Sequence, residues 1–130
     1  MVLSQKIAAT IQQGNQVLNE FQLSPADAIV FTLPLNCKII SATERHSTAG
    51  SDGGAVTLQL RKCLTGQAIA AGTDMLSTAF NMKATANTPQ TSGIVAATAD
   101  CAAGTAIALD YTGTLTALAG VSVSVVYQLA

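Results

Sequence analysis

The sequence is poor in charge and in aromatic side chains. Charged residues make up 10% of the 130 positions, against about 25% in an average globular protein, and tryptophan is absent. Six lysines and arginines against seven aspartates and glutamates give a net charge of -1. No basic cluster is larger than Arg61 and Lys62, so the chain lacks the positive surface that neutralises phosphates, and we expect no nucleic acid partner.

Long apolar runs are also missing. No segment reaches the ~18 apolar residues that a membrane helix needs, because Gly, Thr or Gln interrupts every candidate. The start has no basic segment followed by an apolar one, since Gln12 and Gln13 come too early for a secretion signal. We therefore expect neither a membrane partner nor secretion.

Signatures of metal binding and catalysis are missing as well. Cys37, Cys63 and Cys101 lie too far apart for zinc ligands, so we interpret them as reduced, apolar side chains in strands. The single histidine, His46, has no nucleophile-elbow turn beside it, and we interpret its surroundings as a solvated loop in which Arg45 or His46 could contact a partner. The seven carboxylates are spread singly along the chain. We expect no enzyme, no metal and no cofactor.

Alanine, threonine, glycine and serine dominate the sequence instead. The exterior should therefore consist of small, neutral side chains, which suit close and dry contact with other chains. A surface with so little charge would be a solubility hazard on a monomer, so we expect a homo-oligomer, and a trimer rather than a dimer.

From about Ala28 onward, apolar and polar residues alternate as in strands with one buried face. Turn signals rich in Gly, Pro and Asn separate these segments at roughly ten-residue spacing, which predicts an all-β, antiparallel two-sheet sandwich over residues 25–130. A helix within residues 94–108 is disfavoured by Thr98, Gly104 and Thr105. The predicted strands are residues 30–33, 36–43, 56–61, 78–84, 94–99, 105–111 and 121–129.

Residues 1–24 have a different character, because glutamine and asparagine separate the apolar positions. We interpret them as an N-terminal arm whose apolar residues are covered by a partner chain. Two alternatives stay open: a short helix, although Gly14 would fall in its middle, and a first strand of the sandwich at residues 17–24. The arm residues that we expect to contact a partner are Leu3, Ile7, Ile11, Val17 and Leu18.

The strand and turn motifs resemble those of small jelly-roll structural proteins of tailed bacteriophages, and most of all the capsid decoration, or cement, proteins. The resemblance extends over about residues 28–129 and includes no catalytic residue. The motifs that carry it are residues 31–34, 37–42, 64–73, 84–88, 103–109 and 121–125.

This resemblance implies a non-enzymatic virion protein that is made in the host cytoplasm and stabilises the outer capsid by binding neighbouring major capsid proteins. Such proteins are typically homotrimers or homodimers, often with an N-terminal extension that touches the shell. A glycan-binding or receptor-binding module of a head fibre or tail remains the alternative, although Tyr111 and Tyr127 fall on the apolar phase of their strands. A hydrolase on a sandwich fold is the third hypothesis.

Overall fold

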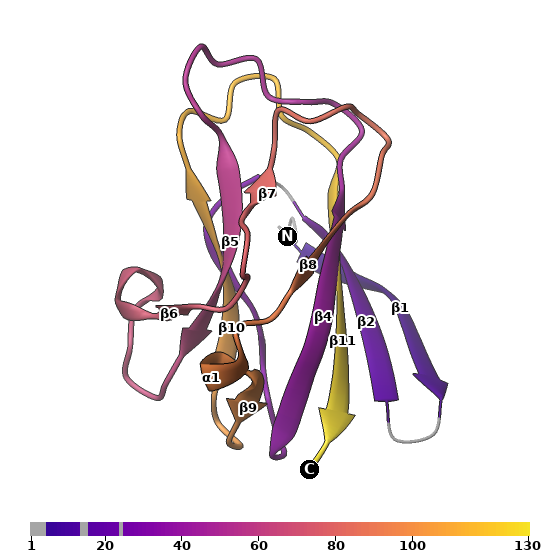
Figure 1. Cartoon of the computed structure of the whole chain (residues 1–130), viewed down its shortest axis with the longest axis vertical. Coiled ribbons are helices and arrows are strands. Elements are labelled where there is room, and N and C mark those ends of the chain that lie inside the picture. The colour runs from indigo at the N-terminus through magenta and orange to yellow at the C-terminus, as the bar shows by residue number, and fades with distance from the viewer. Residues whose placement is uncertain (1–4, 14–15, 24) are drawn as a thin grey trace.

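The protein consists of two antiparallel β-sheets packed face to face in this computed structural model (Figure 1). The structure describes residues 5–13, 16–23 and 25–130. Every strand pair among these residues is antiparallel. The predicted all-β, two-sheet sandwich is therefore confirmed.

The larger sheet has the strand order β1-β2-β11-β4-β8, and β9 also pairs with β4. Its strands are β1 (Gln5–Gln13), β2 (Gln16–Leu23), β4 (Cys37–Arg45), β8 (Gln90–Gly93), β9 (Asp100–Cys101) and β11 (Val121–Leu129).

The smaller sheet has the order β3-β10-β5-β6, and β7 also pairs with β5. Its strands are β3 (Ala28–Thr32), β5 (Thr57–Cys63), β6 (Thr73–Asp74), β7 (Phe80–Asn81) and β10 (Ala106–Thr112). A 3-10 turn, η1 (Ile69–Ala71), precedes β6, and a single helical turn, α1 (Ala96–Ala99), precedes β9.

The strands form nested pairs that connect distant parts of the chain. β2 lies next to β11, β3 next to β10, β4 next to β8, and β5 next to β7. A long hairpin that is rolled up on itself gives this order, which is that of a jelly roll. β11, the last strand, pairs with both β2 and β4 and so lies at the centre of the larger sheet.

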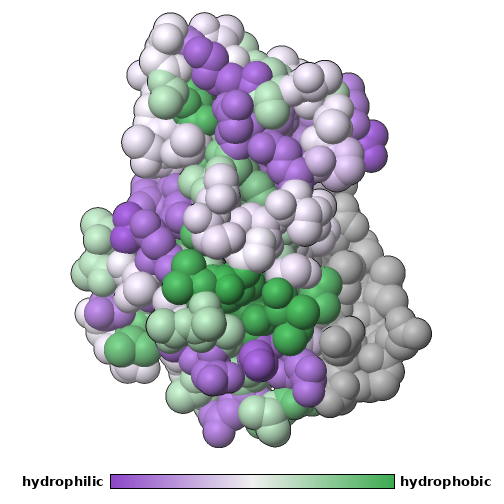
Figure 2. Space-filling model, viewed as in Figure 1, coloured by the Kyte–Doolittle hydropathy of each residue, from purple (hydrophilic) through white to green (hydrophobic). Residues whose placement is uncertain are grey.

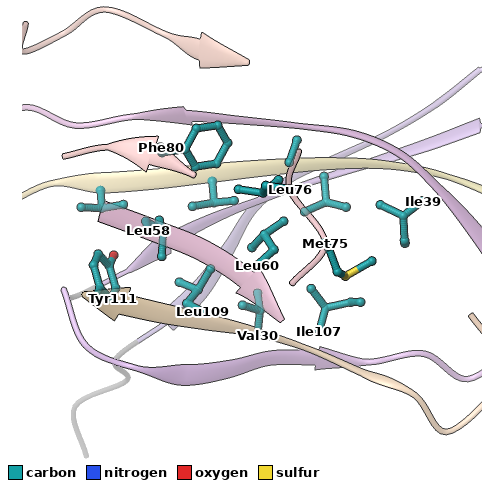
Figure 3. Close-up of a cluster of buried hydrophobic side chains, with 14 of the residues drawn as sticks. Val30, Ile39, Leu58, Leu60, Met75, Leu76, Phe80, Ile107, Leu109 and Tyr111 are labelled. Carbon is teal, nitrogen blue, oxygen red and sulfur yellow. The ribbon is translucent and has the colours of Figure 1, made fainter. Parts of the chain in front are cut away.

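The core lies between the two sheets and is built by the alternation within their strands (Figure 3). In β11, Val121, Val123 and Val125 are at most 1% exposed, whereas Ser122 and Ser124 between them are half-buried. From the smaller sheet, Leu60 and Leu109 occupy directly opposite positions on β5 and β10, and both are fully buried. Burial of such side chains contributes about 1.5–3 kcal/mol each.

The N-terminal residues form a β-hairpin rather than a helix. β1 and β2 pair from Gln5 opposite Leu23 to Gln13 opposite Gln16, with a bulge between Ile7 and Ala9. β2 then pairs with β11 along its whole length. Residues 17–23 thus lie in a strand of the larger sheet, where the alternative of a first strand places them, and the role of the hairpin as an arm toward a partner stays a prediction.

Two of the predicted strands, residues 94–99 and 78–84, consist mostly of helical and other turns. In the segment 94–99, Thr98 donates from its backbone amide and its hydroxyl to the Val95 carbonyl, at 2.9 and 2.8 Å, and this closes the turn α1. In the segment 78–84, β7 ends at Asn81, whose side-chain Oδ1 accepts from the Lys83 amide and starts a turn. Local hydrogen bonds of this kind compete with strand pairing.

Candidate functional site

The outer face of the larger sheet carries small polar side chains. Thr43 in β4 lies between Ser124 of β11 and Thr91 of β8, and its hydroxyl is 3.0 Å from that of Thr91. Arg45, which is exposed, lies opposite Ser122. Arg45 is the charged residue among these five, and β4 also exposes Lys38 and Ile40 near its start.

The β1–β2 hairpin extends this sheet beyond β11, at the right of Figure 1. Of the five arm residues predicted to contact a partner, Ile7 and Ile11 lie in β1, and Val17 and Leu18 lie in β2. Leu3 lies outside the described residues. Ile11 and Leu18 are directly opposite each other in the register.

Backbone register also links the hairpin to Arg45. Gln22 of β2 and Arg45 of β4 are both register partners of Ser122 in β11. Four of the arm positions and Arg45 therefore lie in one sheet. The arm positions are in β1 and β2, Arg45 is in β4, and β11 lies between β2 and β4.

His46 is buried, and the expectation of a solvated loop is wrong for this residue. It is 1% exposed, and its side chain lies on the inner side of the sandwich next to Glu44, which is 0% exposed. His46 Nδ1 is 2.9 Å from Glu44 Oε2, and His46 Nε2 is 2.9 Å from the carbonyl oxygen of Ala84. With its ring enclosed in this way, His46 offers no side-chain surface to a partner, whereas Arg45 does.

A buried carboxylate needs partners, and Glu44 has two. Besides His46, the Gln90 side chain donates to Glu44 Oε1 at 2.8 Å. Burial raises the pKa of Glu44, and the hydrogen bonds and charge of His46 and the Gln90 amide act in the opposite direction. Sequence spacing held a signal for this site: residues 42, 44 and 46 share the inward phase of β4 and its extension.

A second polar network fastens a loop to the outer face of the smaller sheet. Arg61 of β5 contacts the Asp110 carboxylate at 2.8 Å and the Asp74 carboxylate at 3.0 Å, and it donates to the Gly72 carbonyl at 2.8 Å. Beside it, Ile69 of η1 packs against a small buried cluster (Cys63, Ala106 and Ala108). This network was not predictable from the sequence, because Arg61 and Asp110 lie 49 positions apart and meet only through the pairing of β5 with β10.

The three cysteines are buried, free thiols in strands, as expected for small apolar side chains. Cys37 and Cys101 are directly opposite each other on β4 and β9. Burial raises the pKa of each of the three thiols, which keeps them protonated and poorly nucleophilic at neutral pH.

Two shallow hollows lie near the base of the sandwich, close to α1 and β9. Their walls include one amine, Lys62, and one carboxylate, Asp100, and no histidine lines either of them. No group of three or more metal-ligating side chains occurs in the described ranges, and no helix there is long and apolar enough to cross a membrane.

An apolar band crosses the face shown in Figure 2. Exposed large apolar residues in the described part of the chain include Ile40 in β4 and Val95 just before α1. Ile40 is 36% exposed and Val95 is 38% exposed.

Comparison with known proteins gives one structural likeness. A chain described as "Cyanophage Pam1 capsid asymmetric unit" has a similar fold, with a TM-score of 0.57 and 15% sequence identity over 96% of this chain and 94% of that chain. At this identity the likeness shows a shared fold. No family model matches the sequence, and no curated protein matches it either.

Proposed function

We propose that this chain is a non-enzymatic structural protein of a bacteriophage virion, and that it decorates the outer capsid by binding neighbouring major capsid proteins. The observation that carries this proposal is the fold likeness to a chain of a phage capsid asymmetric unit. The likeness extends over nearly the whole of both chains, so it relates the two folds as a whole.

The outer face of the larger sheet supports a role in close packing. Ser122, Ser124, Thr43 and Thr91 present hydroxyl groups and little bulk, so a neighbouring protein can approach the sheet closely. Burying charged groups in a contact costs more than burying hydroxyls that find partners. A subunit that covers a capsid lattice gains from a face of this composition.

Self-association is part of the same proposal. A chain with 10% charged residues needs contacts that cover its neutral surface, and a closed trimer provides them. Light scattering in dilute buffer should give a mass of about 40 kDa, three times the 13.2 kDa of the chain. A single species of 13.2 kDa at tens of micromolar would overturn the trimer.

The hairpin strand β1 is proposed to anchor the protein to the shell. Removing residues 1–15 deletes β1 and spares β2, which pairs with β11. We expect the truncated protein to remain an all-β fold by circular dichroism but to bind particles that lack the protein about tenfold more weakly, a loss of about 1.4 kcal/mol. Co-sedimentation with such particles measures the occupancy.

The control for this truncation is Leu64→Ser, a change at an exposed position after β5 in the other sheet. It should bind as the full-length chain does. Equal occupancy of truncated and full-length protein would contradict the anchoring role of β1. Failure of the full-length chain to bind these particles would contradict the proposed function itself.

A further inference from the structure

Glu44 and His46 form a hydrogen-bonded pair whose proton content is fixed by geometry. The carbonyl of Ala84 can only accept, so His46 Nε2, 2.9 Å away, must carry a hydrogen. His46 Nδ1 lies 2.9 Å from Oε2 and 3.1 Å from Oε1 of Glu44. A contact between Nδ1 and a carboxyl oxygen is attractive only when one further proton lies between them.

That proton has two places, and both leave the pair neutral overall. It resides on Nδ1, which gives an imidazolium beside a carboxylate, or on Glu44, which gives a neutral imidazole beside a carboxylic acid. Loss of the proton would turn the Nδ1 lone pair toward a buried carboxylate. Gain of a second proton would leave a buried imidazolium without a counter-charge. Both changes are costly at sites that are 0% and 1% exposed.

The pair fastens the loop of residues 82–89, which crosses from β7 in the smaller sheet to β8 in the larger one. His46 bonds Ala84 through its ring, and its own carbonyl accepts from the Asn87 amide at 2.7 Å. At the end of the loop, Gln90 donates to both Glu44 Oε1 and the Asn81 carbonyl. These bonds join Glu44 of β4 and the nearby His46 to the middle of the loop and to the residues that flank it.

We propose that Glu44 and His46 act as a pH-sensitive clamp, which holds the 82–89 loop against β4 while the pair shares one proton and releases it when that proton is lost or a second is bound. This inference does not depend on the proposed function. It concerns the end of the sandwich at which the loops 46–56, 82–89 and 113–120 gather, at the top of Figure 1.

The charged and titratable groups around the pair leave it as the element that responds near neutral pH. Tyr111 of β10 interacts with Glu44 across the sandwich, and burial raises its pKa, so it stays neutral. The Asp27 carboxylate accepts a hydrogen bond from the backbone amide of Tyr111. Lys83 of the loop donates to the Gly54 carbonyl, and Arg45 is exposed to solvent.

The sign of the pH dependence follows from the protons held by each state. In the open state the two side chains are treated as those of an unfolded chain, which give up the glutamate proton near pH 4.3 and the histidine proton near pH 6.5. The closed pair keeps one proton. Above about pH 6.5 the closed state therefore binds one proton more, and closure weakens up to tenfold per pH unit as pH rises. Below about pH 4.3 the open state binds one more, and closure weakens as pH falls. The raised pKa of Glu44 agrees with retention of the proton on the alkaline side.

Hydrogen exchange of the Asn87 amide tests the clamp. Its protection factor, taken relative to that of the core amide of Met75, should be constant between pH 5 and about pH 6.5 and then fall, up to tenfold per unit, to pH 8.5. In Glu44→Gln, the new amide donates to Nδ1 of a neutral imidazole and its carbonyl accepts from Gln90, so the closed state holds no extra proton. Its relative protection should therefore be constant above about pH 6.5 and fall as pH drops below that value, where the histidine of the open state binds a proton. The control Asp100→Asn, at an exposed carboxylate, should behave as the wild type does.

Equal pH dependence in the wild type and in Glu44→Gln would overturn the proposal. If Glu44→Gln does not fold, the wild-type profile decides instead. A relative protection of the Asn87 amide that stays constant from about pH 6.5 to 8.5 would overturn the proposal.

Discussion

Replacing Val123 with aspartate should destabilise the fold by about 3 kcal/mol or more, a large part of the 5–15 kcal/mol that stabilises a typical domain. Val123 is 0% exposed and lies on the inner face of β11 between Val121 and Val125. β11 is the central strand of the larger sheet, where it pairs with β2 and β4. A carboxylate at this position would be ionised without a partner or would have to bind a proton.

The neighbouring position provides the matched control. Ser124 is half-buried on the outer face of the same strand, so Ser124→Asp keeps the charge change and the strand but leaves the core intact. Urea denaturation followed by circular dichroism compares the two variants with the wild type. A Val123→Asp protein with the wild-type midpoint would show that this face of β11 does not line the core.

The second large effect is expected at Gly113, the residue after β10. Its φ is 96°, in the left-handed region that side chains rarely adopt, and a Cβ added there would lie 2.2 Å from the carbonyl oxygen of Ala55. The obstacle is backbone, so it cannot rotate away. Gly113→Ala should therefore cost about 3 kcal/mol, through strain and displacement of the 46–56 loop, and lower Tm by roughly 10 °C.

Gly53, in the 46–56 loop that Gly113 approaches, is the control for this substitution. A Cβ added to Gly53 meets nothing within 4 Å. Gly53→Ala should leave Tm within a few degrees of the wild-type value, since surface changes are usually within about 0.5 kcal/mol. Calorimetry on both variants measures the difference, and equal Tm values would contradict the close approach of Gly113 to Ala55.

The sequence was sufficient to predict the main strands and the core. Successive side chains of a strand point to opposite faces, so the alternation of apolar and polar residues indicates which face is buried. This is why Val121, Val123 and Val125 could be predicted as core residues without a structure. β5 and β10 were predictable on the same grounds, and their inward residues Leu60 and Leu109 lie in the core. The two-sheet architecture followed from the number and spacing of these strands.

The polar contacts were not predictable in the same way. Glu44 reaches Gln90, and Arg61 reaches Asp110, so each contact joins residues more than 40 positions apart through strand register. No local pattern encodes such a register. The turn α1 was missed because a strand at residues 94–99 would satisfy the same alternation, and the hydrogen bonds of Thr98 decide against it.

The most direct test of the proposed virion role is to locate the protein on intact particles of the phage to which the proposal assigns it. Immunogold labelling with an antibody against the folded domain, combined with cryo-electron microscopy of the same particles, gives both position and copy number. The proposed decoration role predicts label over the whole head and density for a sandwich at regular sites on the outer capsid. Label confined to the tail or to head fibres would contradict it and would favour a receptor-binding module, and particles without label would remove the protein from the virion altogether.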